Sequence, residues 1–362
     1  MRSAIILAAG KGTRMKSALN KVMHPVSNKP MIGHIVCSLR NAGVDNIVVV
    51  VGHGADSVRE YLGDSVSYAV QEPQLGTGHA VMQAQCLKDM DGDTLILNGD
   101  GPCIQSETIE KVFAANADSE MTVLTAVLDD GERYGRIIRN AEGYVDRIVE
   151  AKDCTPQELA VTEINTGIFC FKNRLLFAHL QDIRNDNAQQ EYYLTDLVAI
   201  FNRCGLRVNA IVADDPQETM GVNDRVDLAR AQKWMTRREC ERHMREGVTI
   251  IDPDTVYIDV GVKIGRDTVI YPNVILQGDT VIGERVTILS NSFLRNAKIA
   301  DDVSIDSSKI VESSVGARTT IGPMSHLRNH TEIAEDCRIG NFVEFKNSHF
   351  GTGSKCAHLT YV

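Results

Sequence analysis

The sequence lacks three features that would each point to a class of protein. It has no basic excess, since 38 Lys and Arg stand against 48 Asp and Glu, and a formal net charge of -10 argues against a binder of duplex nucleic acid. It has no apolar segment near the ~18 residues of a membrane span. Its nine cysteines are scattered without a C-x-x-C pair, which favours reduced thiols over disulfides or zinc. We therefore expect a cytoplasmic protein without a nucleic-acid or membrane partner.

Residues 1–223 have the pattern of a sheet that is covered on both faces. Short aliphatic runs such as "AIILAA", "NIVVVV", "DTLILN", "MTVLTAV" and "GIFCF" alternate with amphipathic stretches. Runs that are apolar at every position are buried on both sides, as parallel strands between two layers of helices are. The pattern predicts a Rossmann-like α/β domain of parallel strands. The opening run is too short for a signal peptide and is expected to be its first strand.

Two changes of pattern follow this domain. Residues 224–247 are charged on most faces, with N-cap candidates at Asn223 or Asp224 and a C-cap candidate at Gly247, so they predict a linker helix. Residues 248–362 carry aliphatic residues at a six-residue spacing, which fits neither a helix nor an alternating strand. This period predicts a left-handed parallel β-helix of hexapeptide repeats. The inward-facing series is Ile258, Ile264, Ile270, Leu276, Ile282, Ile288 and Leu294, then Ile299, Ile305 and Val311, then Val315, Ile321, Leu327, Ile333, Ile339 and Phe345.

The turn "LAAGKGTRM", residues 7–15, follows the first apolar run and combines small residues with cations. Gly10 and Gly12 let backbone N–H groups approach a ligand, as a phosphate-binding loop requires. The spacing does not match G-x-x-x-x-G-K-[ST], and it lacks the third glycine of G-x-G-x-x-G. Arg14 and Lys21 would supply positive charge to a polyphosphate. The alternative is a glycine-rich turn with surface cations.

Further stretches carry polar residues at strand ends or in glycine-broken turns. "QEPQLGTGHA" offers amide and hydroxyl groups suited to a base edge, and "LILNGDGP" ends an apolar strand where ligands sit in open α/β sheets. Each signal is weak alone, because a strand-end aspartate is often only a helix cap. Together they predict a ligand site formed by Gln71, Gly76 and Thr77, by Asp100, by Gly135 in "RYGRI", by Asn165 in "INTGIF" and by Asn223 in "ETMGVND".

Taken in order, these motifs with "IVEAKD", "EYYLTD", "IGPMSHLR", "GNFVEFK" and "GSKCAHLTY" resemble the bacterial family of bifunctional N-acetylglucosamine-1-phosphate uridylyltransferases/glucosamine-1-phosphate N-acetyltransferases. The resemblance implies that the first domain joins UTP and N-acetylglucosamine 1-phosphate into UDP-N-acetylglucosamine and pyrophosphate, for peptidoglycan and lipopolysaccharide precursors. The resemblance implies that Arg14 and Lys21 bind the triphosphate and that Asp100 and Asn223 bind Mg²⁺. It also implies that the nucleotide is bound by Leu7, Ala9, Gly10, Gln71, Gly76 and Thr77, and the amino sugar by Gly135, Glu150 and Asn165.

The residue types agree with this chemistry. A sugar phosphate is already an anionic nucleophile, so alignment and charge neutralisation suffice without a Ser, His or Cys base. One carboxylate and one amide oxygen suit a Mg²⁺ that keeps waters and takes phosphate oxygens. Two alternatives stay open. A nucleotidyltransferase for another sugar 1-phosphate is opposed by "GNFVEFK" and "AHLTY", and a silent nucleotide-sensing scaffold would be expected to have lost Arg14, Lys21 or Asp100.

The resemblance also implies a second activity in the solenoid, acetyl transfer from acetyl-CoA to glucosamine 1-phosphate. His358 falls at the position of the general base, and Arg328, Lys346 and Tyr361 match residues that hold the sugar phosphate. The sequence ends at Val362 while the family continues, so we expect little acetyl transfer. Solenoids of this family associate as parallel trimers, which predicts a homotrimer.

The sequence departs from the family at a few positions. Asn20 stands where proline usually precedes the lysine, and it is expected to loosen the loop that positions Lys21. Asn28 and Gln190 each stand where a glycine is common.

Overall fold

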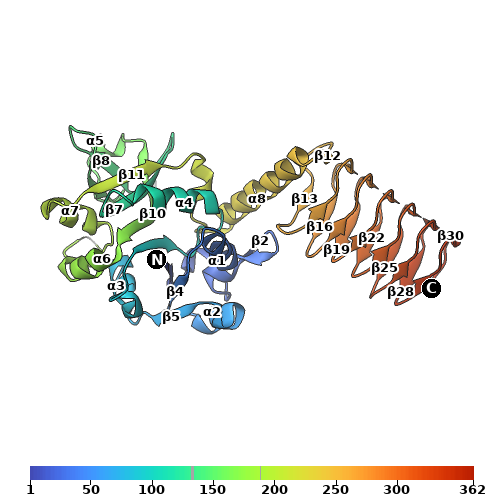
Figure 1. Cartoon of the computed structure of the whole chain (residues 1–362), viewed down its shortest axis with the longest axis horizontal. Coiled ribbons are helices and arrows are strands. Elements are labelled where there is room, and N and C mark those ends of the chain that lie inside the picture. Colours follow the sequence, from blue (N-terminus) through green and yellow to red (C-terminus); the bar gives the residue numbers. More distant parts are fainter. Residues whose placement is uncertain (132–133, 188) are drawn as a thin grey trace. The chain divides into compact units, whose positions relative to one another are not determined.

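The computed structural model describes residues 1–131, 134–187 and 189–362, and these form two compact units, Met1–Ala231 and Gln232–Val362. The division falls inside helix α8, Arg225–Arg245 (Figure 1). The helix is capped by Asp224, whose carboxylate accepts hydrogen bonds from the N–H groups of Val226 and Asp227 at 2.8 and 3.0 Å. Among the described residues, no helix is both long enough and apolar enough to cross a lipid bilayer.

The first unit is built on one mixed sheet that, within the described residues, has nine strands in the order β11-β7-β10-β6-β1-β4-β5, with β8 paired to β10 and β9 to β8. The strands are β1 (Arg2–Ala8), β4 (Asn46–Val51), β5 (Ser67–Val70), β6 (Asp93–Asn98), β7 (Met121–Val127), β8 (Arg136–Arg139), β9 (Val145–Val149), β10 (Glu163–Lys172) and β11 (Val208–Val212). A separate hairpin joins β2 (Pro25–Val26) and β3 (Lys29–Pro30).

The expectation that every strand is parallel is wrong for β10, the run "GIFCF". β10 pairs antiparallel with both β6 and β7. The chain passes from β7 to β10 through β8 and β9, which pair antiparallel, and not through a single crossover helix. A continuous apolar run records burial on both faces but carries no information on strand direction.

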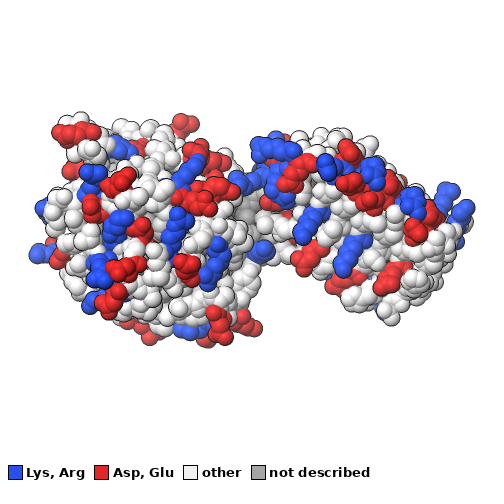
Figure 2. Space-filling model, viewed as in Figure 1, with Lys and Arg blue, Asp and Glu red and all other residues white. Residues whose placement is uncertain are grey.

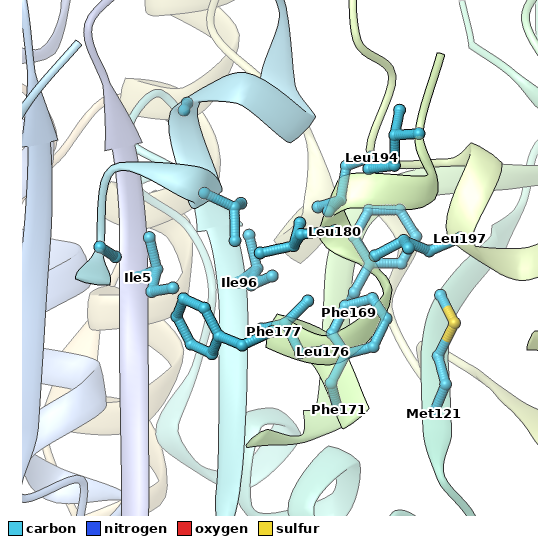
Figure 3. Packing of buried hydrophobic residues seen from close by; sticks show 14 of the residues in the cluster. Ile5, Ile96, Met121, Phe169, Phe171, Leu176, Phe177, Leu180, Leu194 and Leu197 are labelled. Carbon is cyan, nitrogen blue, oxygen red and sulfur yellow. The ribbon is translucent and has the colours of Figure 1, made fainter. Parts of the chain in front are cut away.

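Helices cover both faces of this sheet, and β1 shows how one strand serves both layers. Ala4, Ile6 and Ala8 pack with α1 (Met31–Asn41), α2 (Ala55–Leu62) and α4 (Ser106–Ala115). Ile5 points to the other face, toward α3 (Thr77–Met82), α6 (Asn173–His179) and α7 (Asp196–Arg203). Figure 3 shows this second cluster, with Ile5 and Ile96 beside Phe177. A short helix, α5 (Pro156–Leu159), starts with a capping box at Thr155.

The second unit confirms the six-residue period as a β-helix of three parallel sheets, in which each strand pairs with the third strand after it. One sheet holds β12 (Thr249–Ile250), β15 (Val269–Ile270), β18 (Thr287–Ile288), β21 (Ser304–Ile305), β24 (Thr320–Ile321), β27 (Arg338–Asn341) and β30 (Lys355–His358). The next holds β13 (Tyr257–Ile258), β16 (Ile275–Gln277), β19 (Phe293–Arg295), β22 (Lys309–Val311), β25 (His326–Arg328) and β28 (Glu344–Lys346). The third holds β14 (Lys263–Ile264), β17 (Val281–Ile282), β20 (Lys298–Ile299), β23 (Ser314–Val315), β26 (Glu332–Ile333) and β29 (His349–Phe350).

Corners of the β-helix place non-glycine residues in the left-handed backbone region. At one corner the side chains alternate in charge from coil to coil: Asp267, Arg285, Asp302, Arg318 and Asp336 all have φ between 55° and 60°. Arg285 Nε donates to Asp302 at 2.7 Å, and Arg318 Nε donates to Asp336 at 2.7 Å. These pairs are exposed, so each contributes little to stability. Figure 2 shows acidic and basic side chains interspersed over the visible face of each unit.

Candidate functional site

The candidate site lies at the edge of the first sheet where β1, β5 and β6 end. Ala9 and Gly10 follow β1, Gln71 follows β5 and Asp100 follows β6. Because β10 is antiparallel, its first half reaches the same edge and brings Asn165 there. The direction of β10, which the sequence pattern missed, thus places one of the predicted ligand residues.

Two adjoining cavities open at this edge. The first, of about 370 Å³, is lined by the turn after β1, by Lys21 and by Gln71, Gly76 and Thr77. The second, of about 240 Å³, is lined by Gly135, Glu150 and Asn165. Both include five residues at their common boundary, namely Leu7, Thr77, Asn98, Asp100 and Asn223. The structure therefore brings every residue predicted for the first domain to the walls of one bipartite cleft.

Gly12 fixes how the turn after β1 meets Lys21. Its φ is +58°, a left-handed conformation that favours glycine, and a Cβ there would lie 2.6 Å from Cβ of Lys21. The stem of Lys21 consequently lies directly against the Gly12 backbone. Arg14 is exposed in the short 3-10 helix Thr13–Met15 that follows.

The wall around Gln71 is held by side-chain to backbone hydrogen bonds. Gln71 is only 3% exposed, and its Nε2 donates to the carbonyl of Gly76 at 3.0 Å. Gly76 has φ +107°, and a Cβ there would meet the carbonyl oxygen of Tyr192 at 2.6 Å. The Thr77 hydroxyl accepts a hydrogen bond from the N–H of Leu194 at 3.0 Å. This wall of the cavity is therefore tightly packed and held by hydrogen bonds.

Charged groups converge where the two cavities meet. The Lys21 ammonium donates to a carboxylate oxygen of Asp100, and to Oδ1 of Asn223 at 3.1 Å. Arg14 donates to the same Asn223 oxygen at 2.8 Å. The Asn223 N–H donates to the carboxylate of Asp227 at 3.1 Å, which ties Asn223 to the first turn of α8. Residues from three distant parts of the chain thus form one polar cluster.

The donor set suits a hard divalent cation. Oxygens of Asp100 and Asn223 already meet on one cationic group, the ammonium of Lys21, which shows that they can face the same cation. The described residues contain no group of three or more His, Cys, Asp or Glu side chains placed to hold a metal ion. Two protein oxygens leave most of an octahedral shell to water and phosphate, which is the arrangement typical of Mg²⁺.

The second cavity is shaped by an irregularity in β10 and is lined by a half-buried acid, Glu150. The ladder of β10 with β7 shifts register between Asn165 and Ile168. The Asn165 N–H donates to the carbonyl of Gly135 at 2.8 Å. Burial, followed by the neighbouring Asp153, raises the pKa of Glu150, while a hydrogen bond with Thr195 lowers it. The cavity therefore combines a carboxyl group with backbone and amide groups that can bind sugar hydroxyls.

Asp196, at the start of α7, gives the first testable prediction. Burial and the Asp186 carboxylate raise its pKa from 3.8 to about 6. Since the folded-state pKa is the higher one, the free energy of unfolding falls as pH rises through this interval. At pH 8 the ionised Asp196 lowers the free energy of unfolding by about 1 kcal/mol, allowing for solvent screening, and Asp196→Asn should remove this destabilisation. We expect a rise in Tm of roughly 2–4 °C at pH 8.

Thermal unfolding followed by circular dichroism at pH ~8 and pH ~3 measures this effect. The Tm difference should vanish near pH ~3, where Asp196 is largely protonated in both the folded and the unfolded state. Asp118→Asn, at an exposed position, is the matched control and should not change Tm. Equal Tm values for wild type and Asp196→Asn at pH 8 would refute the assignment.

Other lining residues were not identified from the sequence. Asn98, the last residue of β6, lines both cavities, and a Cβ at Gly167 would lie 2.5 Å from its Nδ2. Glu218 lines the second cavity and accepts a hydrogen bond from the Thr108 hydroxyl at 2.6 Å. The position of Asn98 directly before "GD" was a usable signal. Glu218 reaches the site only through tertiary contacts and had no local signal.

The positions that depart from the family also have structural explanations. Asn28 and Gln190 have φ of 66° and 55°, so both occupy the left-handed region that glycine tolerates best. Asn20 does not loosen its loop. It is 8% exposed, and its side chain is hydrogen-bonded on both sides.

The residues predicted for acetyl transfer lie on neighbouring coils of the second unit. Arg328 of β25 pairs directly with Lys346 of β28, and β30 ends at His358. Tyr361 forms a parallel bridge with Glu344, the first residue of β28. These four residues therefore lie on the last described coils, with His358 in the sheet of β27 and β30 and the others along the sheet of β25 and β28.

Comparisons with known proteins agree with both units. The family model "Nucleotidyl transferase" matches residues 3–216, and the model "GMPPB C-terminal domain" matches residues 253–350. "Bifunctional protein GlmU" of Geobacillus sp. (strain WCH70) is 50% identical over 366 residues, which cover 100% of this chain and 79% of the relative. The protein of the same name from Exiguobacterium sibiricum is 49% identical over 362 residues, covering 99% of this chain and 81% of the relative.

A solved structure supports the fold. A candidate glucose-1-phosphate thymidylyltransferase from Bacillus anthracis, in complex with a sucrose, superposes with a TM-score of 0.52 at 24% identity. It covers 64% of this chain and 94% of its own.

Proposed function

The chain belongs to the family of GlmU-type sugar nucleotidyltransferases, and from this premise we propose that it transfers a uridylyl group from UTP to N-acetylglucosamine 1-phosphate. The products are UDP-N-acetylglucosamine and pyrophosphate, for use in peptidoglycan and lipopolysaccharide precursors. The observation that carries the proposal is the cluster of Arg14, Lys21, Asp100 and Asn223 at the boundary of two cavities. Each substrate has a cavity, and the charged cluster lies where they meet.

In the proposed reaction, a phosphate oxygen of the sugar substrate attacks the α-phosphorus of UTP, and the bond to pyrophosphate breaks. The attacking oxygen is already anionic, so the site needs no general base. Ala9, Gly10 and the Gln71–Thr77 wall orient the nucleotide, while Gly135, Glu150 and Asn165 orient the sugar. Arg14 and Lys21 neutralise charge on the phosphates as the bond breaks. Mg²⁺ held by Asp100 and Asn223 would supply further charge neutralisation on the phosphate oxygens.

Pyrophosphate release from purified protein tests the substrate pair directly. With Mg²⁺, UTP and N-acetylglucosamine 1-phosphate we expect turnover, and replacing UTP by ATP or dTTP should lower kcat/KM at least ~100-fold. Glucose 1-phosphate should be a poor partner, because it leaves the sugar cavity partly unfilled. Equal rates with another sugar phosphate would favour a different nucleotidyltransferase. No release with any pair would favour a nucleotide sensor.

Acetyl transfer is the second candidate function, and it stays a prediction. The observation that favours it is the grouping of Arg328, Lys346, His358 and Tyr361 on neighbouring coils. Imidazole is a suitable base near neutral pH for an ammonium substrate that must lose a proton before attacking a thioester. Acetyl-CoA and glucosamine 1-phosphate are the corresponding substrates.

We also propose a homotrimer that forms through the β-helix. At one corner the first coils present Asn273, Asn291 and Ser307, whereas later coils present Met324 and Phe342, which are 58% and 57% exposed. Large apolar side chains at exposed corners are more typical of a covered surface than of a solvated one.

The proposed compartment is the cytoplasm, in keeping with nine cysteines that are all free.

A further inference from the structure

We propose that Asn20 is the positioning residue that directs Lys21 into the site, an inference that rests on the proposed function. Asn20 is only 8% exposed and lies outside both cavities. Its Nδ2 donates to the carbonyl of His53 at 2.7 Å, and its Oδ1 accepts from the N–H of Val22 at 3.1 Å. One amide group therefore joins the sheet scaffold to the turn that carries Lys21.

The scaffold side of this link is the turn after β4. Gly54 has φ +71°, and a Cβ there would lie 3.0 Å from Nδ2 of Asn20. His53 and Gly54 immediately precede α2, whose Val58 and Leu62 pack in the core. The carbonyl that anchors Asn20 thus belongs to a segment fixed between β4, a strand paired on both sides, and a packed helix.

The other side of the link sets the backbone of Lys21. Asn20 caps the 3-10 helix Lys21–Met23, which is closed by hydrogen bonds from Met23 N–H to the Asn20 carbonyl at 3.0 Å and from His24 N–H to the Lys21 carbonyl at 3.3 Å. The side chain of Lys21 then leaves along the Gly12 backbone. Because the backbone of Lys21 is capped and its aliphatic stem is confined, its ammonium group points toward Asp100 and Asn223.

Asn20 has φ of -54° and ψ of 139°, which lies within the φ range that a proline ring imposes. Proline would fix this backbone conformation covalently but would supply no side-chain hydrogen bond. The two residue types therefore hold Lys21 by different means, and this difference provides a rescue variant. Asn20→Ala removes the two side-chain hydrogen bonds and leaves the backbone at this position unrestrained. Asn20→Pro also lacks these hydrogen bonds, but its ring fixes φ and so restores the restraint on the backbone.

Steady-state kinetics of pyrophosphate release separate positioning from general stability. We expect Asn20→Ala to lower kcat about 10-fold with KM for UTP within about twofold, since Lys21 acts mainly in the transition state. Asn20→Pro should regain at least half of the wild-type kcat. Asn41→Ala, a change at an exposed asparagine in α1, is the matched control and should leave kcat unchanged.

A double-mutant cycle with Lys21→Met is the decisive arm. If Asn20 acts through Lys21, Asn20→Ala should change kcat less than about twofold in the Lys21→Met background. An equal loss in both backgrounds, or a fall in Tm without a fall in kcat, would overturn the proposal. If wild-type protein releases no pyrophosphate, the proposed function fails separately. A crystal structure of Asn20→Ala then decides, because a Lys21 ammonium that keeps both contacts would contradict positioning by Asn20.

Discussion

Asp100→Ala should lower kcat for pyrophosphate release by about 1,000-fold or more, because the carboxylate serves two purposes at the centre of the site. It lines both cavities, so its loss affects the point at which the two substrates meet. It is also the anionic partner of Lys21 and the only charged member of the proposed Mg²⁺ ligand pair. Without it, the remaining amide oxygen of Asn223 is a poor cation ligand on its own.

Three measurements make this result specific. Mn²⁺ binding to the protein without substrates, followed by electron paramagnetic resonance, should weaken together with turnover in Asp100→Ala. Thermal unfolding should show that the variant stays folded. Asp89→Ala, at an exposed carboxylate of the same unit, should leave turnover and Mn²⁺ binding unchanged. Wild-type turnover by Asp100→Ala would remove Asp100 from the metal site.

Local sequence patterns predicted the fold where one residue type repeats at a fixed spacing. The six-residue period gave the β-helix, since an aliphatic residue in each short strand must face one interior. The aliphatic runs of the first unit likewise predicted a sheet covered on both faces, and their ends located the edge at which the two cavities open. These features depend on burial, which the order of apolar residues records directly.

Features that depend on distant contacts were not accessible in the same way. The direction of β10 is set by the path through β8 and β9, and the apolar run itself is compatible with either direction. The polar cluster joins Lys21 to Asp100 and Asn223 across 79 and 202 residues. Asn20 is anchored by a carbonyl 33 residues away, so the sequence alone suggested a looser loop than the structure has. The roles of the cleft residues stay predictions for mutagenesis.

Arg14→Ala should lower kcat by about 100- to 1,000-fold while KM for UTP changes only a few-fold. Arg14 is exposed at the wall of the first cavity, where screening by solvent leaves its charge adding little to ground-state binding. Its charge becomes valuable when negative charge moves onto the leaving pyrophosphate. Arg14→Lys should recover only part of the rate, because an ammonium lacks the planar fork that pairs with two phosphate oxygens.

Lys16→Gln, which removes an exposed cation from the same turn, is the control and should leave kcat unchanged. An effect of Arg14→Ala confined to KM would assign Arg14 to nucleotide binding alone. Arg14 can also affect the rate indirectly. It donates a hydrogen bond to Oδ1 of Asn223 at 2.8 Å and so helps to orient a proposed Mg²⁺ ligand. The Mg²⁺ concentration at half-maximal rate separates this indirect effect from direct action on the phosphates. It should stay constant if Arg14 acts on the phosphates, whereas a rise would show that Arg14 works by holding Asn223.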